Sequence, residues 1–291
     1  MQPADSDTPT HEVGLPITAA DGAAIQLLWR APETAVRDVL YWMPALGVAA
    51  RHYLPLAEAL AARGIAVAIH EWRGIGSSNR RAGRHVDWGY RQLLELDMPA
   101  GIAVMRGQWP GARYWIGGHS LGGQLATIYG ALHPQDFNGL TLTASGAPYW
   151  RRFPQSWPIG LAYVAAPWLA RLVGYLPGRR IGFGGNEARG VIDDWARTGR
   201  TGRYAARGMA DDMEAKLAAL NWPILTQRMQ DDWLVPQPSL DWLLGKMPLA
   251  PRRSHILASG DLGGTPADHF SWMKTPDAIA AHIADWIDAG T

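Results

Sequence analysis

The feature that most constrains this chain is the segment Gly118-His119-Ser120-Leu121-Gly122. An apolar run at 114–116 precedes it and predicts a short buried strand, and residues 121–131 follow with the composition of a helix. A serine at the apex of so sharp a turn is held in strained backbone geometry, and the glycines around it lie too close together for a Cβ atom. The pattern G-x-S-x-G between strand and helix therefore predicts an elbow that exposes Ser120 as a nucleophile. A glycine-rich turn that contains serine by chance is the alternative.

Length and composition allow one large domain with an inserted subdomain, because 291 residues with 47% hydrophobic content can bury a sizeable core. The net charge of +1 gives no reason to expect nucleic-acid binding. The absence of cysteine excludes disulfides and thiolate chemistry, and no metal-ligand spacing occurs, so we expect neither metal nor organic cofactor. The polar start, residues 1–12, predicts no signal peptide, and no apolar run has the length of a membrane span. We expect a cytoplasmic protein.

Apolar strands alternate with helices along most of the chain, and this pattern predicts an α/β protein with a mostly parallel sheet covered on both faces. Asp21-Gly22 marks a hairpin between the first two strands. The expected strands are 12–19, 24–30, 36–42, 65–69, 114–116, 139–144, 223–226 and 254–258. The expected helices are 53–63, 88–106 with a kink at Pro99, 121–131, 240–246 and 276–288.

The alternation stops at Pro148 and resumes near Trp222. Residues 151–215, called the cap segment below, contain helical pieces and no convincing strand. We therefore expect a core made of residues 1–150 and 216–291, with the cap segment inserted between two strands of one sheet as a helical lid.

A serine hydroxyl needs a base to take its proton, and the base needs an orienting carboxylate. Behind an elbow of this kind the chain order is serine, acid, histidine. Of the four later histidines, His133 follows the elbow helix too closely, His255 lies within a strand and His282 lies in the last helix. His269 lies in a loop between the last strand and the last helix, where a base can reach the strand ends, so we predict His269 as the base. An ordinary loop histidine is the alternative.

Two neighbouring carboxylates follow the strand at 223–226. The spacing D-x-x-V-P to Val235-Pro236 favours Asp232 as the orienting acid, and Asp231 remains a candidate that could instead cap the turn. For the oxyanion, the backbone amide of Leu121 lies directly after the serine. The loop after the strand at 36–42 supplies the second donor in this arrangement, which predicts the amide of Leu46.

With these residues placed, the chain resembles the α/β-hydrolase fold superfamily, in particular serine-aminopeptidase-like and lysophospholipase-like bacterial hydrolases. The segments that carry the resemblance are PALGVAARHYLPLAEALAARGIAVAIHEWRGIGSS, GHSLGGQ, DDWLVP and GDLGGTPADHF. The chain departs from the pattern at Pro44-Ala45, where His-Gly is usual, and at Glu71, where Asp is common. We expect Glu71 to form a structural ion pair with Arg73. The resemblance implies acyl transfer through an acyl-enzyme and does not identify a substrate.

The cap segment is the expected roof of the substrate pocket. Residues 151–210 contain ten Arg and three acidic residues, which indicates either an anionic ligand or membrane surface, or simply solvated arginines. Its tryptophans either line an acyl pocket or pack between the cap and the core; these are Trp150, Trp157, Trp168 and Trp195. We expect a small-molecule partner with an apolar acyl group. An ester or thioester hydrolase is the first hypothesis, and an aminopeptidase, an acyltransferase and a ligand sensor are the alternatives.

Overall fold

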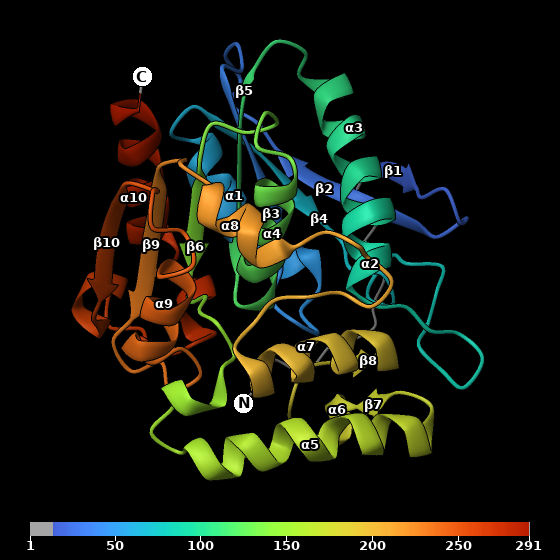
Figure 1. Ribbon diagram of the computed structural model, residues 1–291. Coiled ribbons are helices and arrows are strands. Elements are labelled where there is room, and N and C mark those ends of the chain that lie inside the picture. The colour runs from blue at the N-terminus through green and yellow to red at the C-terminus, as the bar shows by residue number, and fades with distance from the viewer. Residues whose placement is uncertain (1–13, 291) are drawn as a thin grey trace.

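An eight-stranded sheet runs through the centre of the structure, a computed structural model that describes residues 14–290 (Figure 1). The strand order is β1-β2-β4-β3-β5-β6-β9-β10, and every pairing from β4 to β10 is parallel. The strands are β1 (Leu15–Thr18), β2 (Ala24–Arg30), β3 (Asp38–Met43), β4 (Ile65–His70), β5 (Arg113–His119), β6 (Leu140–Thr143), β9 (Ile224–Met229) and β10 (Arg252–Leu257). The predictions for residues 1–12, including a first strand that begins at Glu12, lie outside the described residues.

Both faces of the sheet are covered, as the apolar strands predict. In β3, Val39 and Tyr41 belong to one hydrophobic cluster, and Leu40 and Trp42 belong to another on the opposite face. Helices α1 (Leu54–Ala61) and α10 (Asp277–Ala289) pack together against one cluster, and α3 (Met98–Gln108), α4 (Leu121–Leu132) and α8 (Met213–Ala219) contribute to the other. The α/β-hydrolase fold class is confirmed.

The helix expected at 88–106 is not one continuous α-helix. It begins as α2 (Tyr90–Gln92), widens into a π-helical turn at Leu93–Asp97 and continues as α3. Pro99 lies in the first turn of α3 and has no N–H to donate to the preceding turn, so the chain accommodates it where the helix changes pitch.

Strand β3 lies between β4 and β5. After β3 the chain passes to β4 on one side of it, and it then crosses back to form β5 on the other side. The loops after β3 and β5 therefore diverge at the carboxyl ends of the two strands. In open α/β sheets this switch point forms the crevice in which ligands bind. The segment from β9 to α9 (Gln237–Leu244) and the loop after β10 end at the same edge of the sheet.

The cap segment lies over this edge of the sheet (Figure 1). It contains α5 (Ser156–Val173), α6 (Gly178–Ile181) and α7 (Arg189–Thr201), and α7 lies between α5 and the sheet. It also contains a short antiparallel pair, β7 (Leu176–Pro177) with β8 (Asn186–Glu187), so the expectation of no strand was wrong. Two residues per strand are too few to give a recognisable alternation.

The boundary expected at residue 215 falls inside α8, which packs on α4. We propose that the cap segment is a lid whose last turns join the core there. Within residues 14–290, no helix is both long and apolar enough to cross a bilayer.

Candidate active site

The serine lies at a sharp turn between β5 and α4. Its backbone has φ 53° and ψ −121°, in the left-handed half of the map that residues with a Cβ rarely occupy. A Cβ atom on Gly118 would lie 2.7 Å from the carbonyl carbon of Gly122, and one on Gly122 would lie 2.1 Å from the carbonyl oxygen of Met43. The two glycines are therefore required by close backbone contact. The backbone of Ser120 is held by its N–H, which donates to Thr143 (3.3 Å).

His269 and Asp232 form a buried pair. His269 Nδ1 lies 2.8 Å from Asp232 Oδ2, and the two residues are 5% and 3% exposed. The other oxygen, Asp232 Oδ1, accepts hydrogen bonds from the backbone amides of Leu234 (2.9 Å) and Val235 (3.0 Å). Asp231 is exposed, and of the two adjacent acids only Asp232 contacts the imidazole.

The other histidines after the serine lie where the sequence places them. His133 directly follows α4 and stacks on Tyr129 (4.3 Å between ring centroids). His255 in β10 and His282 in α10 stack on each other at 3.9 Å. Among residues 14–290, no three His, Asp or Glu side chains are grouped as a metal site requires.

A tyrosine that the sequence analysis did not single out connects the elbow to the loop after β3. The Tyr53 hydroxyl accepts a hydrogen bond from the Ala45 amide (2.9 Å) and lies 2.8 Å from His119 Nδ1. Because the amide can only donate, the hydroxyl proton is directed to His119. Burial lowers the pKa of His119 well below its ordinary value, which keeps the ring neutral. The ring of His119 in turn lies 4.7 Å from that of His269, so the buried pair lies against the elbow.

The two predicted oxyanion residues come together at one cavity. Leu46 and Leu121 both line a small, partly open space of about 10 Å³. The loop that carries Leu46 is held by Trp72, whose indole N–H lies 3.1 Å from the carbonyl oxygens of Pro44 and of Ala45. The loop turns at Gly47, which has φ +76°.

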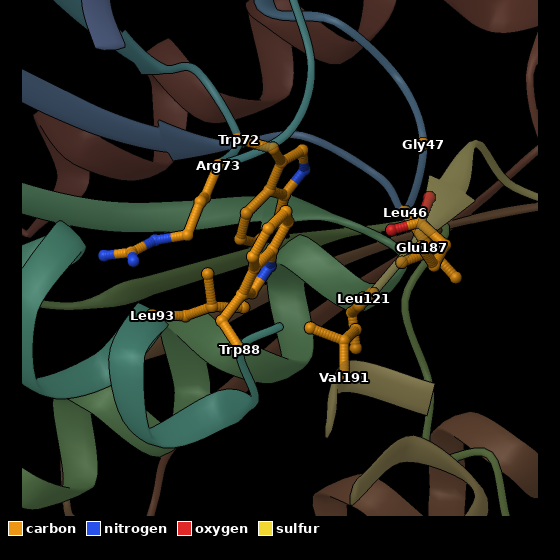
Figure 2. A pocket seen from close by; sticks show the side chains of 9 residues that line it. All are labelled: Leu46, Gly47, Trp72, Arg73, Trp88, Leu93, Leu121, Glu187 and Val191. Carbon is orange, nitrogen blue, oxygen red and sulfur yellow. The ribbon is translucent and has the colours of Figure 1, made fainter. Parts of the chain in front are cut away.

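The cap segment reaches this cavity through Glu187, which lies beside Leu46 and Gly47 (Figure 2). Glu187 Oε1 accepts a hydrogen bond from the Gly185 amide (2.8 Å), and burial raises the pKa of this carboxyl group to about 7. A Cβ atom on Gly47 would lie 2.0 Å from the Gly185 nitrogen, so the two backbones are in direct contact. The cap segment therefore packs onto the loop that carries Leu46.

The four cap tryptophans do not line this cavity. Trp157 and Trp168 are 74% and 63% exposed, Trp150 packs beside Trp157, and Trp195 packs on Tyr163 of α5. Of the two alternatives for these tryptophans, the structure supports packing between the cap and the core for Trp195, which lies against the main hydrophobic cluster, whereas Trp157 and Trp168 lie on the outer surface. The aromatic walls are Trp72 and Trp88, which come from the core (Figure 2).

The expected ion pair between Glu71 and Arg73 is absent. Arg73 instead forms bonds with Asp97 (Nη2 to Oδ1, 2.5 Å) and Asp21 (Nη1 to Oδ2, 2.6 Å). Glu71 accepts a hydrogen bond from the Ala50 amide (3.1 Å), and burial raises its pKa to about 7. The two side chains have different partners: Arg73 pairs with two carboxylates, and Glu71 accepts hydrogen bonds from the backbone amides of Ala50 and Trp72.

Comparisons with known proteins agree with the fold. A family model described as Serine aminopeptidase, S33, matches residues 34–260. A solved hydrolase from Pseudomonas aeruginosa PA01 is 18% identical, with a TM-score of 0.57, and the match covers 94% of this chain and 97% of that chain. The monoacylglycerol lipase of Paleococcus ferrophilus is 15% identical, with a TM-score of 0.60 and coverage of 92% and 100%. Est1E from Butyrivibrio proteoclasticus, with ferulic acid bound, is 14% identical, with a TM-score of 0.60 and coverage of 94% and 98%.

Proposed function

The chain belongs to the serine aminopeptidase S33 family within the α/β-hydrolase superfamily, and from this premise we propose that it is a serine hydrolase acting on carboxylic esters or thioesters. The observation that supports this most strongly is the buried His269–Asp232 pair, 2.8 Å apart and packed against the elbow that carries Ser120.

In the proposed reaction Ser120 Oγ attacks the acyl carbon while His269 accepts its proton. Asp232 holds the imidazole by its Nδ1–H, which leaves Nε2 as the basic nitrogen. The alcohol or thiol leaves with the proton from His269, and an acyl-enzyme remains. Water then attacks the acyl-enzyme while His269 accepts one of its protons. As the bond between Ser120 Oγ and the acyl carbon breaks, His269 returns that proton to Oγ, and the carboxylic acid is released.

The amides of Leu46 and Leu121 are the proposed oxyanion donors. Leu121 is the first residue of α4, so its N–H is one of the helix-terminal groups without an intrahelical partner. Leu46 lies in a loop whose preceding carbonyls are held by Trp72 and whose amide at Ala45 is held by Tyr53. A donor on a fixed loop needs no reorganisation when negative charge develops on the substrate oxygen.

An apolar acyl group fits the lining beside these amides, which includes Trp72, Trp88, Leu93 and Val191. The space of about 10 Å³ is close to the minimum that holds one water molecule. One structural neighbour, the monoacylglycerol lipase of Paleococcus ferrophilus, is named for the cleavage of an ester, which is consistent with an ester substrate.

Removal of N-terminal residues from peptides is the second candidate, and one observation favours it. Glu187 is a buried carboxyl group beside the proposed oxyanion donors, and a free amino group needs such a partner. Against this, its pKa of about 7 means that burial favours the neutral form. Several other acids of the cap segment have partners elsewhere: Asp193 with Arg171, Asp194 with the Tyr90 amide and Glu214 with Lys246.

A fluorophosphonate probe followed by two substrate panels tests the proposal. The wild-type protein should react with the probe and Ser120→Ala should not, although both should fold. Turnover of p-nitrophenyl esters of graded chain length would support the ester hydrolase, and preferential turnover of aminoacyl naphthylamides would support the peptidase. Labelling of the wild-type protein together with only slow hydrolysis of both panels would favour an acyltransferase or a ligand sensor. Labelling of Ser120→Ala would refute the assignment of Ser120 as the nucleophile.

The cytoplasmic location is a further proposal, tested by cell fractionation.

A further inference from the structure

The outer face of α5 carries a continuous row of exposed apolar side chains. Five of the ten exposed large apolar residues within 14–290 lie on this one helix. They follow one another at spacings of three and four residues, so they occupy one face of the helix. We call this row the α5 stripe; it consists of Trp157 (74% exposed), Leu161 (67%), Val164 (47%), Trp168 (63%) and Leu172 (71%).

The opposite face of α5 already supplies the packing that the fold needs. Tyr163, Pro167 and Ala170 are buried there, and α5 packs on α7. Figure 1 shows α5 at the periphery of the molecule, with α7 between it and the sheet. The α5 stripe therefore contributes nothing to the hydrophobic core, and a patch of this kind on a protein surface marks an interaction site.

Most of the charges around the stripe are positive. Helix α5 contains no acidic residue and carries Arg171 in its last turn. Exposed Arg151 and Arg152 precede the helix, and exposed Arg179 and Arg180 lie in the neighbouring α6. Asp193 in α7 forms a salt bridge with Arg171 (Nη2 to Oδ1, 2.8 Å).

From this geometry we propose that the α5 stripe lies on the surface of an anionic lipid bilayer. Tryptophan and leucine enter the boundary between headgroups and acyl chains, and the arginines on either side bind lipid phosphates. An α-helix of 18 residues is about 27 Å long, so α5 presents a long apolar edge parallel to the bilayer plane. This mode of binding needs no membrane-spanning helix.

The same charges argue against a second copy of the chain as the occupant. A two-fold contact through α5 brings the same surface of both copies together. Antiparallel helices would place Arg151 of one copy near Arg171 and Arg180 of the other, and parallel helices would place each arginine beside its equivalent. Either arrangement brings arginines of the two copies close together, which is unfavourable. The lipid phosphates of an anionic bilayer carry the opposite charge and attract these arginines.

Vesicle sedimentation tests this inference separately from the proposed function, because it needs no catalysis. The assay uses full-length Ser120→Ala protein, so that any hydrolysis of lipid cannot change the vesicles. Binding should be strong to vesicles of phosphatidylcholine mixed with phosphatidylglycerol, weak to phosphatidylcholine alone, and reduced by salt. Absence of binding to the mixed vesicles would overturn the inference.

Two matched double variants separate the α5 stripe from general surface hydrophobicity. Leu161→Gln with Trp168→Gln should weaken binding to the mixed vesicles at least tenfold. Leu249→Gln with Ile256→Gln changes two apolar residues of similar exposure (63% and 57%) elsewhere and should leave binding unchanged. Circular dichroism and melting temperature verify that all four positions tolerate the change. Equal binding by both double variants would overturn the inference.

A charge variant and the oligomeric state complete the test. Arg151→Gln with Arg180→Gln should remove the preference for phosphatidylglycerol while the protein stays folded. Light scattering should show that the wild-type protein does not dimerise through α5. A dimer that Leu161→Gln with Trp168→Gln dissociates would assign the stripe to a second copy and overturn the lipid proposal.

Discussion

At the residue scale, the proposed chemistry depends on which of two adjacent carboxylates meets the imidazole. Asp232 directs one oxygen to His269 and receives two backbone amides on the other, so its carboxylate has little freedom to rotate. A carboxylate held in this way fixes the ring orientation of His269 and stabilises the imidazolium that forms when Ser120 loses its proton. Asp231 is exposed, one position earlier, and its side chain lies outside this arrangement.

We predict that Asp232→Asn lowers turnover of the best ester by roughly ten-thousand-fold, as the equivalent change does in a serine protease, because an amide favours the wrong imidazole tautomer. Asp231→Asn is the matched control and should change turnover by less than about twofold. Steady-state kinetics on both purified variants measures this. The reverse ranking would assign the orienting role to Asp231.

The buried carboxyl group of Glu187 predicts a specific pH dependence of stability. Its pKa is about 7 in the folded protein and 4.5 for an ordinary glutamate, so between these values the folded state holds a proton that the unfolded chain has lost. The contribution of this group to stability is full below pH 4.5, falls as the pH rises to 7, and is absent above. Burial of the ionised carboxylate is the physical cause.

Relative to Glu187→Gln, the free energy of unfolding of the wild-type protein should therefore fall by roughly 3 kcal/mol between pH 4.5 and 7. Urea unfolding of both proteins at several pH values measures the difference. Glu71, whose pKa is also raised to about 7, is present in both proteins and cancels. A difference that does not vary with pH would mean that Glu187 is ionised in the folded state throughout this range.

At the element scale, close contacts between backbone atoms constrain which residues can occupy the junction of β5 and α4. The turn at Ser120 is tight because β5 ends against the loop after β3, and the carbonyl oxygens of Met43 and Pro44 occupy the space where a side chain on Gly122 would lie. Tyr53, just before α1, ties that loop to His119 at the end of β5. The elbow is therefore held by neighbouring elements as well as by its own sequence.

We predict that Gly118→Val and Gly122→Val each reduce soluble yield and lower the melting temperature, because a branched side chain would overlap backbone atoms that cannot move. Gly107→Val is a suitable control, since a Cβ atom there meets nothing within 4 Å. The control should fold with unchanged or slightly higher stability, because valine has a better helix propensity than the glycine it replaces. Stable, fully folded variants at both elbow positions would show that the turn tolerates side chains.

At the scale of the whole molecule, the sheet topology brings together residues that are far apart in the chain. Ser120 follows β5, Asp232 follows β9 and His269 follows β10, and these strands end at one edge of the sheet. The cap segment enters between β6 and β9 and extends over the same edge, where Glu187 closes the space beside Leu46. The proposed chemical groups thus belong to the core, and we propose that the cap segment acts as a lid over them.

Replacing residues 151–210 by a short Gly/Ser linker should therefore change substrate choice more than chemistry. Hydrolysis of an acetate ester needs little pocket and should persist. The preference for longer acyl chains should shrink, because each buried methylene contributes about 0.8 kcal/mol. Folding is checked first by circular dichroism, since the deletion exposes apolar surface of the core. An unchanged chain-length profile in a folded variant would show that the cap segment does not shape the pocket.

Local sequence patterns by themselves determined the main secondary-structure elements and the turn at Ser120, because these features depend on backbone preferences that act within a few residues. Apolar runs that alternate with helical spacing predicted the parallel sheet and both helical layers, and two glycines around Ser120 predicted the turn between β5 and α4. The order of serine, acid and histidine, together with the spacing to Val235-Pro236, selected Asp232 and His269, whose side chains lie 2.8 Å apart in the structure.

The partners of buried polar groups were decided only by the tertiary structure. Arg73 bonds Asp97 and Asp21 rather than Glu71, because the side chain that reaches a buried charge depends on how distant elements pack. Tyr53 meets His119 across 66 residues of chain for the same reason. A single sequence encodes these contacts through the whole fold, so no local spacing signals them.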